Sequence, residues 1–166
     1  MRKSRYTISS LTNPTNIANA LTSMKNEKVN STLVSNYVQH IIDSFLISMA
    51  KRYDVKGKTY FKYPNKYYYT DIGLRNARLN YRQYDPGHIM ENIVYNELLR
   101  RGYSVDVGVV TDRTGGANTQ KGIDFVVNDA DKKIIVRMDI PHNFYDDNGI
   151  FHCNLIDLLL GRVELF

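Results

Sequence analysis

The sequence offers few side chains whose types and spacing could perform chemistry. Its four histidines, His40, His88, His142 and His152, do not combine with the single cysteine, Cys153, at the spacing of a zinc site. His152 and Cys153 are adjacent, but neighbouring residues of a strand point to opposite faces. We therefore expect a core thiol beside a surface histidine rather than a Cys–His nucleophile. One cysteine also excludes a disulfide within the chain.

A second pattern with possible chemistry is Gly57-Lys58-Thr59, which resembles the end of a phosphate-binding P-loop. That motif needs a glycine five residues before Gly57, where this chain has Arg52. It also needs a helix to follow, whereas Thr59-Tyr60-Phe61 favours a strand. We therefore expect that this chain neither binds nor hydrolyses a nucleotide at such a site.

Charge divides the chain into a basic half and an acidic half. Residues 1–83 contain 14 Lys and Arg against 4 Asp and Glu, whereas residues 84–166 contain 8 against 13. A basic segment favours a polyanion such as nucleic acid, although lysines also keep a tyrosine-rich surface soluble. No stretch approaches the roughly 18 consecutive apolar residues of a membrane span, and the start lacks the apolar run of a secretory signal. We expect a cytoplasmic protein with no membrane partner.

The first half predicts two helices followed by a β-hairpin. Asn13-Pro14 is a helix start signal, and a second helix begins near Ser31. Strand-forming residues then lie on both sides of a turn at Lys56-Gly57-Lys58. This order is that of a winged helix-turn-helix, which we place at residues 1–70. The second helix carries one apolar stripe that we expect to be buried, formed by Leu33, Val34, Tyr37, Ile41 and Ile42.

In a winged helix, this second helix would lie in the major groove of double-stranded DNA. Its polar side chains could hydrogen-bond to phosphates or base edges: Ser31, Thr32, Ser35, Asn36 and Gln39. Cations of the hairpin could neutralise phosphates and make the affinity salt-dependent: Lys51, Arg52, Lys56 and Lys58. No arginine lies on the helix, so base-specific recognition is not expected. Winged helices also serve as protein-binding modules, and the sequence leaves that alternative open.

The second half predicts two helices and then three strands, which suits an α/β domain. One helix starts near Asp71. A longer helix follows Asp85-Pro86-Gly87 and ends at Arg100-Arg101-Gly102, with cations in its last turn and glycine after it. The three strands are expected at residues 103–109, 122–127 and 133–138. The tyrosine run at 67–69 is expected to be buried between the hairpin and this second half.

Several segments together resemble the C-terminal part of a prokaryotic family of AAA-type ATPases. They are YYYTDIGLRNARLNYRQYDPGHIMENIVYNELLRRGYSVDVG with GIDFVV after it, NPTNIANAL, KRYDVKGK and the terminal GIFHCNLIDLLLG. The resemblance implies an α+β or α/β chain in which a winged helix precedes a reduced restriction-endonuclease-like domain of the PD-(D/E)XK type, here residues 71–166. The family's ATPase domain is absent. The resemblance also implies an internal loss, because KKIIVRMD matches a later family strand than the one expected after GIDFVV.

The same resemblance assigns candidate catalytic and Mg²⁺-binding roles to two acids. Glu91 matches the family's helical acidic position, and Asp124 matches its strand aspartate. The literal acid-x-Lys pattern is Asp131-Lys132-Lys133. If the last two expected strands form a hairpin, Asp124 lies opposite Ile135, and Asp131 lies roughly 13 Å away along the strand, too far to share a metal ion. We therefore expect an incomplete nuclease site and no cofactor, with Mg²⁺ only if nuclease chemistry remains.

Three functions follow from these observations. The favoured one is a non-catalytic DNA-binding or partner-binding protein derived from an AAA-type ATPase. The second is a Mg²⁺-dependent nuclease that uses Glu91 and Asp124. The third is a structural oligomerisation module, since a lost sheet strand would leave an exposed edge that can pair with another copy as a homodimer.

Overall fold

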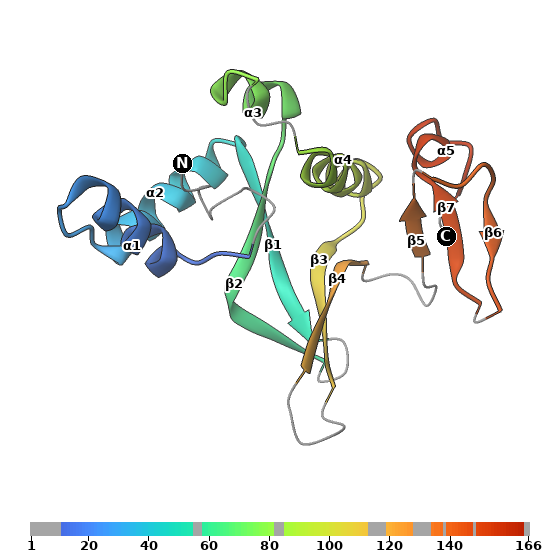
Figure 1. Ribbon diagram of the computed structural model, residues 1–166, viewed down its shortest axis with the longest axis horizontal. Coiled ribbons are helices and arrows are strands. Elements are labelled where there is room, and N and C mark those ends of the chain that lie inside the picture. Colours follow the sequence, from blue (N-terminus) through green and yellow to red (C-terminus); the bar gives the residue numbers. More distant parts are fainter. Residues whose placement is uncertain are drawn as a thin grey trace.

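The computed structural model describes residues 11–54, 58–81, 85–112, 119–127, 134–137, 139–147 and 149–164 of the 166-residue chain. These residues form five helices and two mixed sheets, so the mixed α+β class is confirmed (Figure 1). None of the described helices is long and apolar enough to cross a membrane. In chain order, the elements are α1 (Pro14–Lys25), α2 (Ser31–Asp43), β1 (Ile47–Asp54), β2 (Thr59–Tyr69), α3 (Ile72–Arg78), α4 (Pro86–Arg100), β3 (Val105–Asp112), β4 (Thr119–Val127), β5 (Ile134–Arg137), β6 (Phe144–Tyr145), β7 (Phe151–Asn154) and α5 (Leu155–Leu159).

The first four helices begin at side chains that accept hydrogen bonds from the backbone. Asn13 accepts one from the Asn16 N–H at 2.7 Å, and Asn30, Asp71 and Asp85 accept equivalent bonds at the starts of α2, α3 and α4. Such caps satisfy N–H groups that have no partner within the helix. The predicted starts of these four helices are confirmed.

The larger sheet has the strand order β2-β1-β3-β4 and contains strands from both expected units. β1 pairs antiparallel with β2 on one side and parallel with β3 on the other, where Arg52 lies opposite Val107. Parallel strands need a long crossover connection, and α3 and α4 lie within it. The hairpin of the segment 1–70 therefore continues directly into the sheet of the segment 71–166.

The last two expected strands do not form a hairpin, which corrects the expected position of Asp124. β4 pairs antiparallel with β3, whereas β5 joins a second sheet of order β5-β7-β6, in which Ile135 lies opposite His152. A turn-like sequence predicts a reversal of the chain but not the partner of the next strand. That partner depends on burial, and β3 presents the buried residues Val105, Val107 and Val109 beside β4.

Helix α4 lies between the two sheets, and both pack against it (Figure 1). Tyr68 of β2 stacks on Tyr95 of α4 with ring centroids 4.0 Å apart, and Phe125 of β4 lies 6.0 Å from both rings. The predicted burial of the tyrosine run between the hairpin and the second half is confirmed for Tyr68, which is 0% exposed. Tyr67 is 8% exposed but faces α2 instead, and Tyr69 is half-buried. The core also includes Ala50, Val94, Leu98, Cys153, Leu155 and Leu158.

The apolar stripe of α2, which we expected to be buried, is only partly buried. Val34 is 5% exposed, but Leu33, Tyr37 and Ile41 are 50%, 61% and 39% exposed. Helix α1 packs against α2, and Val34 is the residue of α2 that becomes buried. Periodicity alone predicts an apolar face but not how much of that face a neighbouring helix covers.

Asn92 links α4 to the edge strand β2 by hydrogen bonds, and this contact provides a test of the fold. Its side chain is 1% exposed, accepts the Tyr69 N–H at 2.9 Å and donates to the Tyr69 carbonyl at 2.7 Å. Asn92→Ala leaves both backbone groups without this partner, so we expect a loss of about 2–3 kcal/mol in the free energy of unfolding. Urea denaturation measures it, with the exposed Asn19→Ala as control. Equal stability of the two variants would contradict this role.

Glu97 holds Arg101 at the end of α4, and Arg101 contacts α5. Arg100 binds both Glu97 oxygens at 2.7 and 2.8 Å, and Arg101 Nε binds one of them at 2.8 Å. Arg101 also donates to the carbonyls of Leu158 and Val163. The hydrogen bonds from Arg100, together with the one from Arg101, lower the pKa of Glu97 to about 2, against the opposing effect of burial.

This lowered pKa predicts the pH dependence of Glu97→Gln. A carboxyl group whose pKa falls on folding stabilises the folded state above its ordinary value of 4.5, and this contribution disappears as the pH falls toward 2. Glu97→Gln should therefore be less stable than the unchanged chain at pH 7, and the gap should narrow at pH 3. Urea midpoints at the two pH values measure this. A gap of constant size would show that the ionised Glu97 does not stabilise the fold.

Candidate functional site

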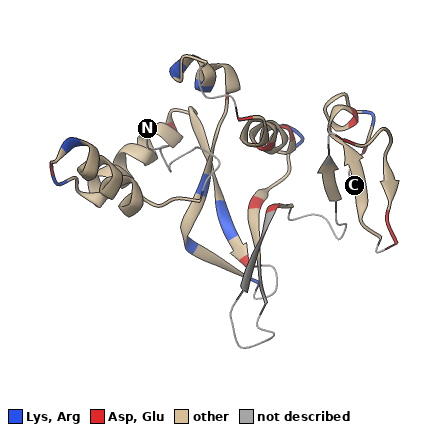
Figure 2. Cartoon of the chain, viewed as in Figure 1, with Lys and Arg blue, Asp and Glu red and all other residues tan. Residues whose placement is uncertain are grey.

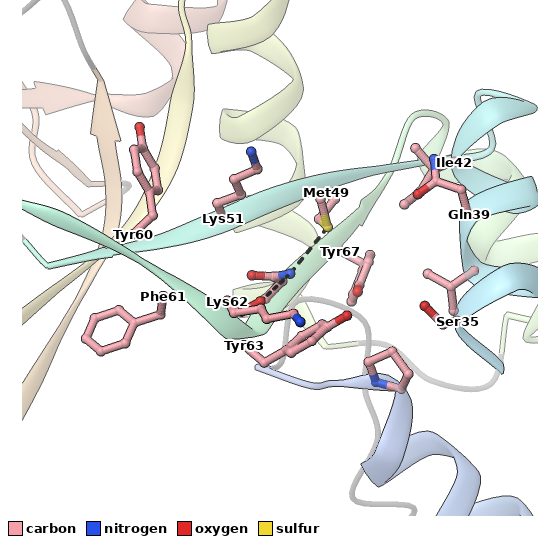
Figure 3. Close-up of a pocket in the computed structure, with 13 residues that line it drawn as sticks. Ser35, Gln39, Ile42, Met49, Lys51, Tyr60, Phe61, Lys62, Tyr63 and Tyr67 are labelled. Atoms are coloured by element: carbon pink, nitrogen blue, oxygen red, sulfur yellow. Dashed lines mark hydrogen bonds between the residues drawn. The ribbon is translucent and has the colours of Figure 1, made fainter. Parts of the chain in front are cut away.

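A groove of about 450 Å³ lies between α2 and one face of the β1–β2 hairpin (Figure 3). Ser35, Val38, Gln39 and Ile42 project into it at helical spacing from α2. Met49 and Lys51 come from alternate positions of β1. The remaining lining residues are Pro14, Tyr60, Phe61, Lys62, Tyr63, Asn65 and Tyr67.

The groove is cationic and aromatic. Lys51 and Lys62 are exposed, and no acidic residue is among those that line the groove. Within the described part of the chain, neither lysine forms an ion pair with a carboxylate. Lys51 Nζ lies 5.9 Å from the centre of the Tyr60 ring. Figure 2 shows this basic character along β1 and β2, whereas acidic residues lie on β3 and α4.

The structure brings three of the predicted DNA-binding residues, Ser35, Gln39 and Lys51, into this groove. Gln39 Nε2 also donates to Asp43 Oδ1 at 2.8 Å. Arg52 is not among the residues that line the groove, and its guanidinium lies 5.0 Å from the centre of the Phe61 ring.

The other predicted contacts lie elsewhere. Thr32 and Asn36 are exposed on α2 outside the groove, and Ser31 is half-buried. They share the helix with the exposed Leu33, Tyr37 and Ile41, so the outward surface of α2 is more apolar than a polar reading helix requires. Lys58 is exposed beside the hairpin turn, and Lys56 lies outside the described residues.

Sequence reasoning missed Lys62 and Tyr63, which line the groove from β2. The available signal was the alternation of lysine and aromatic residues in KTYFKYPNK, which we used only to predict a strand. Which of these side chains share a face depends on an irregularity in the β1–β2 register between Ala50 and Arg52. A shift of this kind changes the face of every residue beyond it, and the sequence does not reveal it.

The two candidate acids, Glu91 and Asp124, approach the same lysine on the opposite face of the sheet. Lys66 Nζ lies 2.7 Å from Glu91 Oε1 and 3.9 Å from Asp124 Oδ1. The Tyr68 hydroxyl donates to the same Glu91 oxygen at 2.6 Å, and His88 Nδ1 lies 3.7 Å from Glu91 Oε2. The side chains of Lys66 and Glu91 are both 13% exposed, whereas that of Asp124 is 79% exposed.

Sequence reasoning also missed Lys66. It comes from the hairpin, and its partners come from α4 and β4, so only the tertiary structure brings the three together. Burial raises the pKa of Tyr68, and its hydrogen bond to Glu91 raises it further. The Tyr68 hydroxyl therefore stays protonated and acts as a donor to Glu91.

This arrangement does not fit the magnesium ion that a nuclease would need. Mg²⁺ requires oxygen ligands in near-octahedral geometry, but Glu91 Oε1 already accepts from the Lys66 ammonium and the Tyr68 hydroxyl. Across the described ranges, no group of three or more His, Cys, Asp or Glu side chains could hold a metal ion. The positive charge between Glu91 and Asp124 is that of Lys66.

Cys153 and His152 do not form a nucleophilic pair. Cys153 is fully buried, and burial raises the pKa of its thiol, which keeps it protonated. His152 stacks on Phe144 with centroids 4.7 Å apart, and its Nε2 lies 3.2 Å from Asp146 Oδ2. The predicted core thiol is confirmed. The prediction of a surface histidine is wrong, because the His152 side chain is only 12% exposed.

Two relatives of this chain have no assigned function. An uncharacterized protein of Haemophilus influenzae is 37% identical over 147 residues, which cover 87% of this chain and 34% of that protein. The uncharacterized protein MJ1544 of Methanocaldococcus jannaschii is 36% identical over 87 residues, which cover 52% of this chain and 19% of that protein. The chain thus spans about a third of the length of the first relative. No protein-family model matches the chain, and no solved structure matches it significantly.

The different burial of the two acids gives a test of the Lys66 cluster. Lys66→Met removes the cation beside the nearly buried Glu91, so we expect a loss of about 1–3 kcal/mol in the free energy of unfolding. Asp124→Asn affects an exposed, distant pair and should cost no more than about 0.5 kcal/mol. Adding Glu91→Gln to Lys66→Met should restore part of the loss, as a double-mutant cycle in urea measures. Equal effects of Lys66→Met and Asp124→Asn would contradict this ranking.

Proposed function

We propose that this chain is a non-catalytic nucleic-acid-binding protein that holds DNA at the groove between α2 and the β1–β2 hairpin. The single observation that carries this proposal is the composition of the groove. The residues that line the groove include two lysines and several aromatic residues, and none of them is acidic. Among the described residues, neither lysine has a carboxylate partner. Phosphates are attracted to such a surface, and counterion release makes the binding salt-dependent.

The order of two helices and a hairpin supports an interpretation of residues 11–69 as a winged helix, the module implied by the resemblance to AAA-type ATPases. In that interpretation, the hairpin is the wing and contacts the phosphates of double-stranded DNA. No arginine lies on α2, so the expected contacts are to the backbone rather than to specific bases.

The Lys66 cluster supports the non-catalytic part of the proposal. Hydrolysis of a phosphodiester by a nuclease of the PD-(D/E)XK type needs a metal ion that polarises the phosphate and activates water. In this chain, the acid on α4 is neutralised by Lys66 and hydrogen-bonded by Tyr68. Glu91 and Asp124 are therefore better explained as partners of an internal cation than as metal ligands.

A protein partner is the second candidate function. The exposed side chains of Leu33, Tyr37 and Ile41 favour it, because they form an apolar row along the outward side of α2. A mass in sedimentation that rises with protein concentration, together with no DNA binding, would support this alternative.

Reversing the charge of the groove tests the proposed function. The double variant Lys51→Glu and Lys62→Glu should bind a duplex oligonucleotide at least about tenfold more weakly, because it loses two phosphate contacts and adds two repulsive charges. The dependence of log K on log salt should become shallower by about 2. Lys25→Glu with Lys28→Glu is the matched control, since both lysines are exposed and neither lines the groove.

Equal losses in the two double variants would show that only the overall charge matters and would overturn the proposed site. The same incubations with Mg²⁺ test the rival enzyme. Cleavage that requires Mg²⁺ and disappears in Asp124→Ala would replace the non-catalytic proposal with a nuclease.

A further inference from the structure

We infer that the groove between α2 and the β1–β2 hairpin takes the unpaired bases of single-stranded nucleic acid. This inference rests on the proposed nucleic-acid function and specifies which form of nucleic acid the groove accepts. The lysines of the hairpin can still contact duplex phosphates.

The shape of the groove favours a single strand. Proteins read duplex DNA by placing a convex element, such as a helix, into a major groove about 12 Å wide. Here the protein surface is hollow, and its volume of about 450 Å³ falls in the range of small-molecule binding clefts. The phosphates of a double helix can contact the lysines at the rim of such a hollow, but its paired bases cannot enter. One or two bases that have left a strand can.

The aromatic side chains favour bases over other polyanions. Tyr63 is 40% exposed, so its ring is accessible from the groove side of the hairpin. The Tyr60 ring already packs against Tyr53 and lies under Lys51, and its hydroxyl donates to Asp106 at 2.8 Å. Figure 3 shows Tyr63 and Tyr67 projecting toward the side of the groove formed by α2. Accessible rings inside a basic groove are the combination that single-strand-binding proteins use, because every base has a face that stacks.

The lysines and the α2 side chains complete the site. Lys51 and Lys62 project from β1 and β2 and can pair with the phosphates on either side of a stacked base. Ser35 and Gln39 face them from α2 and can hydrogen-bond to base edges. An acidic peptide would satisfy the lysines but would leave the exposed rings without a flat partner.

The test compares three fluorescent 12-mer oligonucleotides by anisotropy: a single strand, its duplex, and an abasic single strand with the same phosphates. The unchanged chain should bind the base-bearing strand about tenfold more tightly than the abasic strand, which is the scale of stacking on one aromatic ring. Tyr63→Leu should reduce this preference to near one, and Tyr63→Phe should keep it because the ring remains. Tyr81→Leu, at a tyrosine that is 75% exposed and outside the groove, is the matched control.

The outcomes separate this inference from the proposed function. Equal binding of base-bearing and abasic strands, with the duplex bound as well, overturns the inference and leaves the proposed function intact. Absence of binding to all three nucleic acids overturns both. If Tyr63→Leu and Tyr81→Leu reduce the base preference equally, the bases bind outside the groove, and the inference is overturned. The inference is also overturned if a poly-glutamate peptide competes with the single strand and binds with the same affinity as that strand. If Tyr63→Leu does not fold, the difference in affinity of the unchanged chain for abasic and base-bearing strands still tests the inference.

Discussion

The parallel pairing of β1 with β3 determines how the rest of the molecule is arranged. It joins a hairpin from the basic half to a hairpin from the acidic half, so the two halves share one sheet and one core. A winged helix attached by a flexible linker would leave both faces of its hairpin open to solvent. Here one face packs against α4, and the groove lies on the face beside α2.

The two faces of β2 differ in chemistry because successive residues of a strand point in opposite directions. Lys66 and Tyr68 meet Glu91 of α4, whereas Asn65 and Tyr67 line the groove with α2. The four consecutive residues 65–68 therefore contribute to both clusters. On the α4 face, the positive charge is used within the protein, and on the α2 face it is not matched by an acid that lines the groove. This contrast is the physical basis for assigning structure to one face and binding to the other.

Helix α4 has a second effect, because it holds the smaller sheet against the larger one. Tyr95 packs toward β2 and β4, and Glu97 with Arg101 anchors the segment that contains α5. Helix α4 therefore contacts the larger sheet through Tyr95 and the segment that contains α5 through Arg101, and it connects the two sheets.

The sequence by itself determined the elements whose signals are local. Asn13, Asn30, Asp71 and Asp85 mark helix starts because a cap depends on residues within one turn, and the alternating β-rich runs mark most of the strands. The charge division and the candidates Ser35, Gln39, Lys51, Glu91 and Asp124 were also readable from residue types and resemblance. Tertiary structure alone decided that β4 pairs with β3 rather than β5, that Lys66 stands between the two acids, and that Lys62 and Tyr63 line the groove. These outcomes depend on the strand register and on which apolar surfaces bury one another across long sequence separations, and neither is encoded in a short stretch of residues.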